Sequence, residues 1–496
     1  MTKILVVGCG VTGSSFVTAF INKSKKLDID NIDIDIINKD DNFAKGLAYG
    51  KNASPFHRIN MRALTMSVKP FKEKHFYKQL AKNQDSKINI IDDNYFYSRL
   101  TFGEYSSTYY LKKLSKIQQR ENIRCNNIID EIIDIKDNGY KIEAVNKEQN
   151  ITQYDIAVIC IGNQPATSYQ YLIGKKGYIH DAWNEGLNNI PANEPVVILG
   201  SGLTSIDFYL TLKENKHQGK IYFVSNHGFL PKVRPLHILH NLKFLTKEYL
   251  EEQIKTNKDK LSLEQIMQLF YKEFETENIK FDINTVLQDL YSKSTQEILQ
   301  QDIAYSQKQS TSFSILKAID ENISIIWNSM TIKAQQEFDK KFKTLWSIYD
   351  YPMPQINAQI LLEAIRNGNL EIIKGLESVV YTEEEKLFKI NFCSENQSTL
   401  KISHVINATG NGINVNNIQN QFLQNTLASK TLISHPLGGI DVDFETGRVK
   451  TKAGLSSNIF FAGSLTRGVH FYTNSAVENA KASARIADYI IKTLTQ

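Results

Sequence analysis

The chain has 496 residues, enough for two or three domains with sizeable hydrophobic cores. Hydrophobic residues make up 42% and charged residues 22%, and a formal net charge of +5 on a chain of this length does not predict nucleic-acid binding. The four cysteines include no Cys-x-x-Cys pair, which argues against a dithiol redox centre and a zinc ribbon: Cys9, Cys125, Cys160 and Cys393. Since a run of about 18 apolar residues and a charged-then-apolar leader are both absent from the sequence, we expect no membrane insertion and a cytoplasmic protein.

The first third of the chain begins as a βαβ unit. A short apolar run precedes a group of glycines, a helical pattern follows, and a second strand alternates apolar and acidic residues, at residues 3–7, 14–21 and 31–37. A loop-like stretch, a hairpin around an Asp-Asn-Gly turn and a buried strand come next, at residues 45–66, 128–145 and 156–161.

The same pattern of strand, glycines and helix opens a second time, at residues 195–199, 204–212 and 221–225. Residues 241–346 are rich in Lys, Glu, Gln and Leu with helical spacing, which predicts a helical insertion. Later strands and a closing helix fall at residues 370–373, 379–381, 388–392, 405–408, 459–462 and 475–494. This order predicts an α/β fold with two Rossmann-like dinucleotide-binding domains, the first of them discontinuous and completed by the C-terminal part of the chain.

The first glycine group is a complete G-x-G-x-x-G motif between a strand and a helix. Gly8 allows the tight turn, Gly10 lets the backbone approach a pyrophosphate, and Gly13 lets the helix pack against the strand. The N–H groups at the start of the helix, around Val11 and Thr12, then face the phosphates. The alternative is a chance glycine-rich turn.

In this type of fold, an acidic residue at the end of the second strand usually holds the ribose hydroxyls. Here that position is Asn38, about 25 residues after Gly13. An amide still hydrogen-bonds a hydroxyl, but more weakly than a carboxylate does. Asp40 or Asp41 could substitute for it.

A second motif begins with Gly200 and Gly202, continues through Leu203 and Thr204, and has Ser205 in place of the third glycine. The alternative is a decayed nucleotide fold that no longer binds. Two dinucleotide folds suggest two dinucleotides, and without a redox cysteine pair they point to a flavin–nicotinamide couple. The flavin would then pass its electrons to oxygen or to an organic acceptor.

Further segments carry a resemblance that spans most of the chain and is sparse in the helical insertion. They are GCGVTG at 8–13, GLAY at 46–49, HRINM at 57–61, Arg99 with GEY at 103–105, CIGN at 160–163, LGSGLT at 199–204, NATG at 407–410 and FAGSLTRG at 461–468. In these segments the chain resembles the two-domain FAD/NAD(P)-binding protein family that includes the FAD-dependent urate hydroxylases. More distantly, it is similar to the N-hydroxylating flavin monooxygenases.

The resemblance implies FAD at the first glycine motif and NADPH or NADH at the second. It places Tyr49, His57 and Asn60 in the loop beside the flavin and Gly463 near the ribityl chain or ring. Other cofactor-binding positions that it implies are Arg99, Gly162, Gly410 and Thr466. The implied FAD-binding domain covers residues 1–168 and 401–496, the NAD(P)-binding domain 169–240 and 347–400, and the helical insertion 241–346.

His57, Asn60 and Arg467 are the catalytic candidates, and each of the side chains beside the flavin has a plainer alternative. Tyr49 could pack against the glycine loop, His57 could be a satisfied loop histidine, and Asn60 could be a turn residue. Arg99 could be an ion-pair partner. Arg467 could stabilise the anionic reduced flavin or form a simple salt bridge.

The end of the second nucleotide strand departs from the family pattern. Family members often carry an Arg after the Ser there, where it could pair with a 2′-phosphate. In this chain Ser225 is followed by Asn226, which cannot form a charged fork with phosphate. His227, Lys232 or Arg234 could compensate, so the preference leans only slightly to NADPH.

These features predict a monooxygenase that hydroxylates a small organic molecule. NAD(P)H reduces FAD, a flavin peroxide forms with molecular oxygen, and one oxygen atom passes to the substrate while water is kept out. No HExxH motif or convincing metal-ligand cluster is present in the sequence, so we expect no metal. Residues 346–354 (WSIYDYPMP) look less basic than the family equivalent, which leaves the substrate, urate included, open.

Two rival functions remain at this stage. The first is an NAD(P)H-dependent flavin reductase or oxidase without oxygen transfer. The second is a non-catalytic dinucleotide-binding redox sensor or scaffold. The sequence leaves the oligomeric state open.

Overall fold

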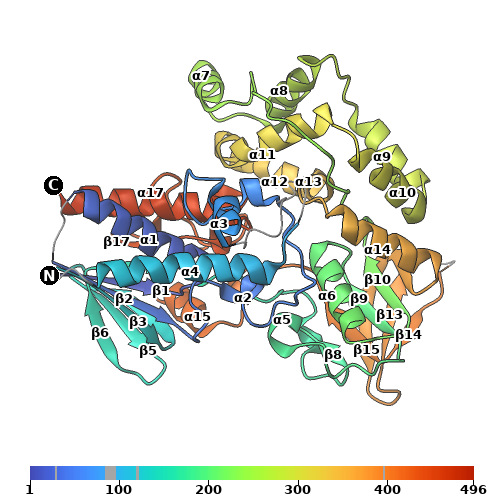
Figure 1. Cartoon of the computed structure of the whole chain (residues 1–496), viewed down its shortest axis with the longest axis horizontal. Helices are drawn as coiled ribbons and strands as arrows, with labels where there is room; N and C mark the ends of the chain where they lie inside the picture. The colour runs from blue at the N-terminus through green and yellow to red at the C-terminus, as the bar shows by residue number, and fades with distance from the viewer. Residues whose placement is uncertain (28–30, 84–95, 119–121, 395–396) are drawn as a thin grey trace. The chain divides into compact units, whose positions relative to one another are not determined.

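The computed structural model describes residues 1–27, 31–83, 96–118, 122–394 and 397–496 (Figure 1). The chain forms two compact units, which are Met1–Thr167 together with Asn411–Gln496, and Ser168–Gly410. Each unit is built around its own mostly parallel sheet with helices, so the predicted α/β class is confirmed. No described helix combines the length and the apolar character needed to cross a membrane.

The first unit contains a six-stranded sheet in the order β16-β17-β7-β1-β2-β3. The strands are β1 (Thr2–Val7), β2 (Ile32–Asn38), β3 (Ile123–Ile129), β7 (Ile156–Ile159), β16 (Arg448–Thr451) and β17 (Gly454–Phe461). All pairs are parallel except β16 with β17. Strands β2 and β7 flank β1 on opposite sides, so the strand order reverses there, and open α/β sheets bind ligands in the crevice at such a point.

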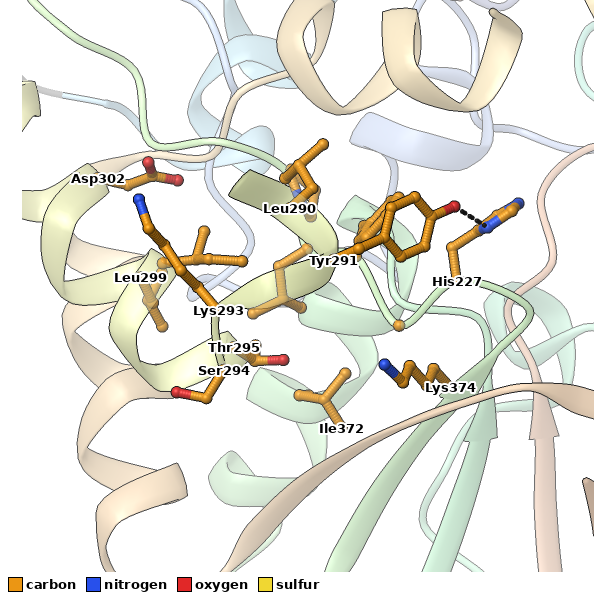
Figure 2. A pocket seen from close by; sticks show the side chains of 15 residues that line it. His227, Leu290, Tyr291, Lys293, Ser294, Thr295, Leu299, Asp302, Ile372 and Lys374 are labelled. Carbon is orange, nitrogen blue, oxygen red and sulfur yellow. Dashed lines mark hydrogen bonds between the residues drawn. The ribbon is translucent and has the colours of Figure 1, made fainter. Parts of the chain in front are cut away.

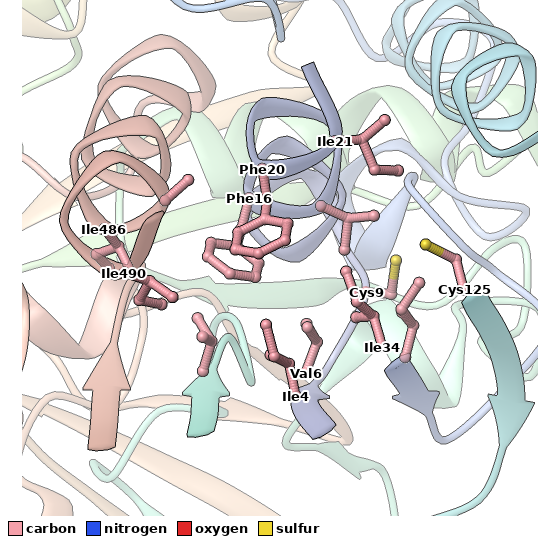
Figure 3. Close-up of a cluster of buried hydrophobic side chains, with 14 of the residues drawn as sticks. Ile4, Val6, Cys9, Phe16, Phe20, Ile21, Ile34, Cys125, Ile486 and Ile490 are labelled. Carbon is pink, nitrogen blue, oxygen red and sulfur yellow. The ribbon is translucent and has the colours of Figure 1, made fainter. Parts of the chain in front are cut away.

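The core of this sheet explains why β1 is an unbroken apolar run. A parallel strand is buried on both faces, and the last four residues of β1 are buried. On one face Ile4 and Val6 meet Phe16 and Phe20 of helix α1 (Val11–Lys26), beside Ile490 of α17 (Ala476–Leu494) (Figure 3). Helix α4 (Arg99–Ile117) also packs against α1.

A smaller antiparallel sheet belongs to the same unit: β4 (Ile132–Asp137), β5 (Ile142–Asn146) and β6 (Ile151–Tyr154). The predicted hairpin turn is present between β4 and β5, with Gly139 at a φ of +87°. The predicted hairpin began too early, because residues up to Ile129 extend β3 and pair with β2. Short helices complete the unit: α2 (Gly46–Tyr49), α3 (His75–Asn83), α15 (Gln421–Ala428) and α16 (Arg467–His470), with 3-10 turns at Ala63–Thr65, Val415–Asn417 and Ser464–Thr466.

The second unit has a five-stranded parallel sheet in the order β11-β10-β9-β15-β8. The strands are β8 (Tyr178–Ile179), β9 (Val196–Leu199), β10 (Ile221–Ser225), β11 (Leu370–Lys374) and β15 (His404–Asn407). The other elements beside it are α5 (Ala182–Glu185), α6 (Leu203–Glu214), α14 (Gln355–Arg366), the 3-10 turn Gln170–Leu172 and an antiparallel sheet of β12 (Leu376–Thr382), β13 (Leu387–Phe392) and β14 (Leu400–Ile402). Because β15 lies between β9 and β8, this unit extends to Gly410, past the predicted 400/401 boundary.

Between β10 and β11 the chain forms a run of helices. They are α7 (Lys247–Asn257), α8 (Leu263–Glu275), α9 (Ile283–Ser292), α10 (Thr295–Ser306), α11 (Thr311–Ser329), α12 (Ile332–Lys341) and α13 (Lys343–Asp350). Side-chain caps explain several of the starts, since Ser262 and Ser294 each form a capping box with the residue three positions on. The helices belong to the second unit and continue slightly past the predicted 241–346 range.

Candidate cofactor-binding sites

The first glycine loop joins β1 to α1, and two of its glycines are required by close backbone contacts. Gly8 has a φ of +88°, and a Cβ added there would lie 2.5 Å from the Cys160 carbonyl oxygen. A Cβ on Gly13 would lie 2.1 Å from the Gly8 carbonyl oxygen. Gly10 is less confined, because the nearest atom to an added Cβ is the Gly46 Cα at 3.4 Å. Gly8 and Gly13 therefore set the turn and the contact between helix and strand, as the motif predicts.

The start of α1 leaves its backbone donors available. Gly10 is the N-cap, no side chain caps the helix, and no acidic residue lies in the first turn. The first N–H groups of a helix have no acceptor within the helix, and with the helix dipole they attract anions. The backbone around Val11 and Thr12 is therefore suited to phosphate oxygens.

Asn38, the predicted ribose contact, also supports the glycine loop itself. Its Oδ1 accepts the Cys9 N–H at 2.9 Å, and its Nδ2 donates to both the carbonyl and the Oδ1 of Asp40, each at 2.9 Å. An aspartate at this position could not make the two donated bonds. The acid best placed beside the loop is thus Asp40, whereas Asp41 is an exposed residue paired with Lys51 at 3.6 Å.

The ends of β7 and β17 meet the start of α1. The Ser464 hydroxyl donates to the Gly162 carbonyl at 2.8 Å, and the Thr466 hydroxyl donates to the Gly463 carbonyl at 2.9 Å. Gly463 has a φ of +103°, and a Cβ there would lie 3.5 Å from the Thr12 Oγ1. Gly162, Gly463 and Thr466 are therefore brought to the same sheet edge as the first glycine loop.

Tyr49 ends α2, which lies between the glycine loop and α4. Its ring is 4.9 Å from that of Phe102, measured between centroids. A Cβ on Gly103 would lie 2.0 Å from the Tyr49 carbonyl oxygen, so Gly103 is what allows the two helices to approach. Gly46, at the other end of α2, faces Gly10. Tyr49 therefore packs against α4, and neither its contact with Phe102 nor that with Gly103 involves the glycine loop considered as its alternative. A flavin contact stays a prediction.

His57 is a buried loop residue that connects its loop to α4. Its Nδ1 accepts the Ser54 N–H at 3.3 Å, and its carbonyl accepts the N–H of Arg99, the first residue of α4, at 2.8 Å. An Nδ1 that accepts a hydrogen bond leaves the ring proton on Nε2 in the neutral form. Asn60 follows in a partly buried bend. The catalytic roles of His57 and Asn60 stay predictions.

Arg467 begins α16, and its guanidinium lies 5.6 Å from the centroid of the Phe471 ring. The same short helix contains His470, which the sequence analysis did not single out. Its ring is buried, stacks on Phe444 and donates from Nε2 to the Phe444 carbonyl at 3.0 Å. Burial, with the Arg485 charge nearby, lowers the pKa of His470 to about 4. His470 is therefore neutral at physiological pH.

Three of the four cysteines are buried thiols with low reactivity. Burial raises the pKa of Cys9 and of Cys125 to about 12, and it raises the pKa of Cys160 further. Cys393 is exposed, and all four cysteines are free. Among the described residues, no group of three His, Cys, Asp or Glu side chains is placed to hold a metal ion.

The second glycine loop joins β9 to α6 and leaves more room. Gly200 has a φ of +119°, and a Cβ there would lie 2.6 Å from the Ala408 carbonyl oxygen. A Cβ on Gly202 would meet no atom within 4 Å, so open space lies beside it. Ser205 is fully buried in the third position. Helix α6 begins at Leu203 and Thr204 without a side-chain cap or an acid in its first turn.

The residues after β10 form a tight turn. The Ser225 hydroxyl lies 2.9 Å from the Ser201 hydroxyl and accepts the Gly228 N–H at 3.0 Å. Asn226 is exposed, and its carbonyl accepts the Gly375 N–H at 3.0 Å. Gly410, with a φ of +97°, is the last residue of the second unit, so the chain passes to the first unit directly after it.

A pocket opens where β10 and β11 end, and α9 and α10 cover it (Figure 2). Its volume is about 200 Å³, less than a site for a whole drug-sized ligand. Its lining comes from the turn after β10, from β11 and from both helices: His227, Gly228, Phe229, Leu230, Pro231, Leu290, Tyr291, Lys293, Ser294, Thr295, Ile298, Leu299, Asp302, Ile372 and Lys374. Lys374 was missed from the sequence because only the pairing of β11 with β10 brings it to this edge. Tyr291 was missed because it reaches the pocket through the packing of α9 on Phe229 and His227.

Comparison with known families bears on the first of these sites. Residues 5–164 match the FAD-NAD(P)-binding family. Over this span the chain is therefore similar to an FAD-NAD(P)-binding domain. The matched span runs from β1 past the end of β7 and includes the first glycine loop, Asn38, Tyr49, His57 and Gly162.

Solved structures share the fold over nearly the whole chain. An ornithine hydroxylase from Pseudomonas aeruginosa is 11% identical, with a TM-score of 0.58 and 99% of each chain covered. An ornithine N-hydroxylase from Kutzneria sp. 744 is 12% identical, with a TM-score of 0.56 and the same coverage. A cadaverine monooxygenase from Erwinia amylovora, bound to FAD, is 11% identical, with a TM-score of 0.54 and coverage of 99% of this chain and 94% of that one. No curated protein sequence matches the chain.

Proposed function

We propose that the protein is an FAD-dependent oxidoreductase that takes hydride from NAD(P)H and hydroxylates a small organic molecule with molecular oxygen. The observation that carries the proposal is the pair of glycine loops, one in each unit. Each loop ends a buried parallel strand and begins a helix whose first N–H groups are uncapped. Two such loops suit two dinucleotides, and hydride transfer between a nicotinamide and a flavin uses two.

The residues of the first unit fit FAD. The confined Gly8 and Gly13 shape the turn, and the less confined Gly10 leaves the backbone open to a pyrophosphate. Asp40, held by Asn38, is the acid available to ribose hydroxyls. When bound, the flavin would supply the acceptor for a nicotinamide hydride, a chemistry that no amino-acid side chain provides.

The residues of the second unit fit a nicotinamide dinucleotide. Gly202, beside open space, permits a phosphate to approach the backbone, and the start of α6 supplies donors. The alternative of a decayed second fold is disfavoured because this space is open rather than filled by a side chain.

The buried thiols favour oxygen or a small molecule as the final electron acceptor. A reductase that passes electrons through its own dithiol needs two neighbouring reactive cysteines, whereas Cys9, Cys125 and Cys160 are buried thiols whose pKa values are raised. The folds shared with hydroxylases that act on ornithine and cadaverine make primary amines the first substrates to test. The resemblance to urate hydroxylases rests on cofactor segments, so urate belongs in the same panel.

The test begins with the visible spectrum of the purified protein and continues with anaerobic addition of NADPH and then NADH. The proposal expects flavin bands that bleach with at least one nucleotide. Oxygen is then readmitted with ornithine, cadaverine or urate, and hydroxylated product is compared with nucleotide consumed. If the protein consumes NAD(P)H but produces only hydrogen peroxide with every compound, the alternative function of an oxidase would be favoured. A protein that FAD cannot reconstitute would overturn the proposal.

A further inference from the structure

The pocket at the ends of β10 and β11 lies where the adenosine end of a dinucleotide belongs. In the order β11-β10-β9, the glycine loop follows β9, and the ribose of a bound dinucleotide meets the end of the next strand, β10. The pocket wall begins two residues after that end, at His227. The Ser201 hydroxyl donates to the Phe229 carbonyl at 2.6 Å, so the wall is tied directly to the glycine loop.

Three aromatic rings line this pocket from two different elements. His227 stacks on Phe229, with 5.5 Å between centroids and 15° between planes. Tyr291 of α9 lies edge-on to Phe229 at 5.1 Å, and its hydroxyl is 3.1 Å from the His227 Nδ1 (Figure 2). Tyr291 is 51% exposed, so its ring is accessible. Flat, partly exposed rings are suited to stacking a nucleobase.

Most of the charged side chains at or near the pocket already contact neighbouring groups. Lys232 is bound to Asp302 at 2.8 Å, which also neutralises the one carboxylate of the lining. Lys293 pairs with Asp289 at 3.2 Å. Arg234 is 8% exposed and lies against the Phe313 ring, away from the pocket lining. Of the three residues expected to compensate for Asn226, only His227 therefore reaches the pocket.

Lys374 is the exposed cation that remains. It is the last residue of β11, it lines the pocket, and among the described residues no carboxylate lies within salt-bridge distance of it. A Cβ on Gly228 would lie 2.9 Å from the Lys374 Cβ, so the residue stands directly against the turn that follows β10. Figure 2 shows its ammonium nitrogen turned inward, on the same side of the pocket as His227.

We propose that this pocket binds the adenosine end of the nicotinamide dinucleotide, with Tyr291 beside the base and Lys374 paired with the 2′-phosphate, so that the enzyme prefers NADPH. The proposal rests on the function proposed above and assigns its cofactor preference to one lysine. An ammonium with no carboxylate partner forms a charge-assisted hydrogen bond with the 2′-phosphate of NADPH. The bond that it can form with the 2′-hydroxyl of NADH is weaker, because the hydroxyl is neutral.

The test measures the binding of adenosine 2′,5′-bisphosphate and of 5′-AMP to the full-length protein by isothermal titration calorimetry. Lys374→Ala should raise the Kd of the bisphosphate about tenfold or more while the Kd of 5′-AMP changes little. Lys374→Arg should retain most of the difference, and Tyr291→Ala should weaken both ligands. The matched control is Lys333→Ala, which removes an exposed lysine of α12 that is absent from the pocket lining.

Equal effects of Lys374→Ala on both ligands, or no effect on either, would overturn the assignment. A wild-type protein that binds both ligands equally would overturn it as well. Failure here is distinct from failure of the proposed function. A yellow protein that NADH bleaches as readily as NADPH would refute the role of Lys374 and leave the oxidoreductase standing, whereas absence of flavin would refute the oxidoreductase.

Discussion

The first glycine loop should separate stability from cofactor binding when two of its glycines are changed one at a time. In Gly13→Ala the new Cβ would lie 2.1 Å from the Gly8 carbonyl oxygen, so α1 must move relative to β1. Overpacking of this kind costs about 1–3 kcal/mol. In Gly10→Ala the nearest atom is 3.4 Å away and the φ of −75° suits alanine. The free energy of unfolding should then fall by less than about 1 kcal/mol, because alanine is a poorer N-cap than glycine.

Binding of FAD should show the opposite order, with Gly10→Ala weakening it more than Gly13→Ala does. The Gly10 methyl would stand where the backbone has to approach the pyrophosphate, so Gly10→Ala should raise the Kd for FAD about tenfold or more. The assays are urea unfolding of the apoprotein, followed by circular dichroism, and titration with FAD, followed by flavin fluorescence. Gly139→Ala, in the exposed β4–β5 turn, is a glycine substitution outside the loop, so it should leave the Kd for FAD unchanged. If Gly10→Ala bound FAD normally, or Gly13→Ala were as stable as wild type, the assigned roles would be wrong.

Three further changes test neighbouring groups. Asn38→Asp should destabilise the apoprotein by about 1–3 kcal/mol in the same urea assay, because it removes two donated bonds and places a second carboxylate beside Asp40. The folded-state pKa of His470 is lowered to about 4 from an unfolded value of 6.5, so the contribution of His470 to the free energy of unfolding is complete above pH 6.5 and is lost as the pH falls toward 4. His470→Gln should therefore make the loss of urea stability over that pH range smaller. An unchanged pH profile would contradict the assignment. Ser205→Ala should leave nucleotide binding intact and keep or raise the melting temperature, because the buried Ser205 hydroxyl has no hydrogen-bond partner among the described residues; a clear fall would mean that the hydroxyl has one.

Local signals made the two strand–glycine–helix openings predictable. The motif has a fixed spacing, and the apolar runs before it are strands buried on both faces. The hairpin turn at Gly139 is equally local. The closing helix was also predictable, because its apolar residues recur at helical spacing along the face that packs on α1.

What the sequence could not supply depends on contacts between distant segments. Asn38 was assigned to ribose from its place after β2, but its bond to the Cys9 N–H exists only because β1 and β2 are adjacent. Lys374 reaches the pocket because β11 pairs with β10 after the whole helical run. The place of β15 between β9 and β8 likewise decides where the second unit ends.

The two glycine loops also show which structural feature determines the residue at the third position of the motif. Gly13 is indispensable because α1 approaches β1 so closely that a Cβ would overlap the Gly8 carbonyl. Ser205 carries a real Cβ at the equivalent place, and its hydroxyl lies 3.2 Å from where a Cβ on Gly200 would be, so the start of α6 stands farther from its loop. The third position therefore reports the distance between helix and strand rather than the ability to bind. The second position is the one a phosphate approaches, and at Gly202 that space is open.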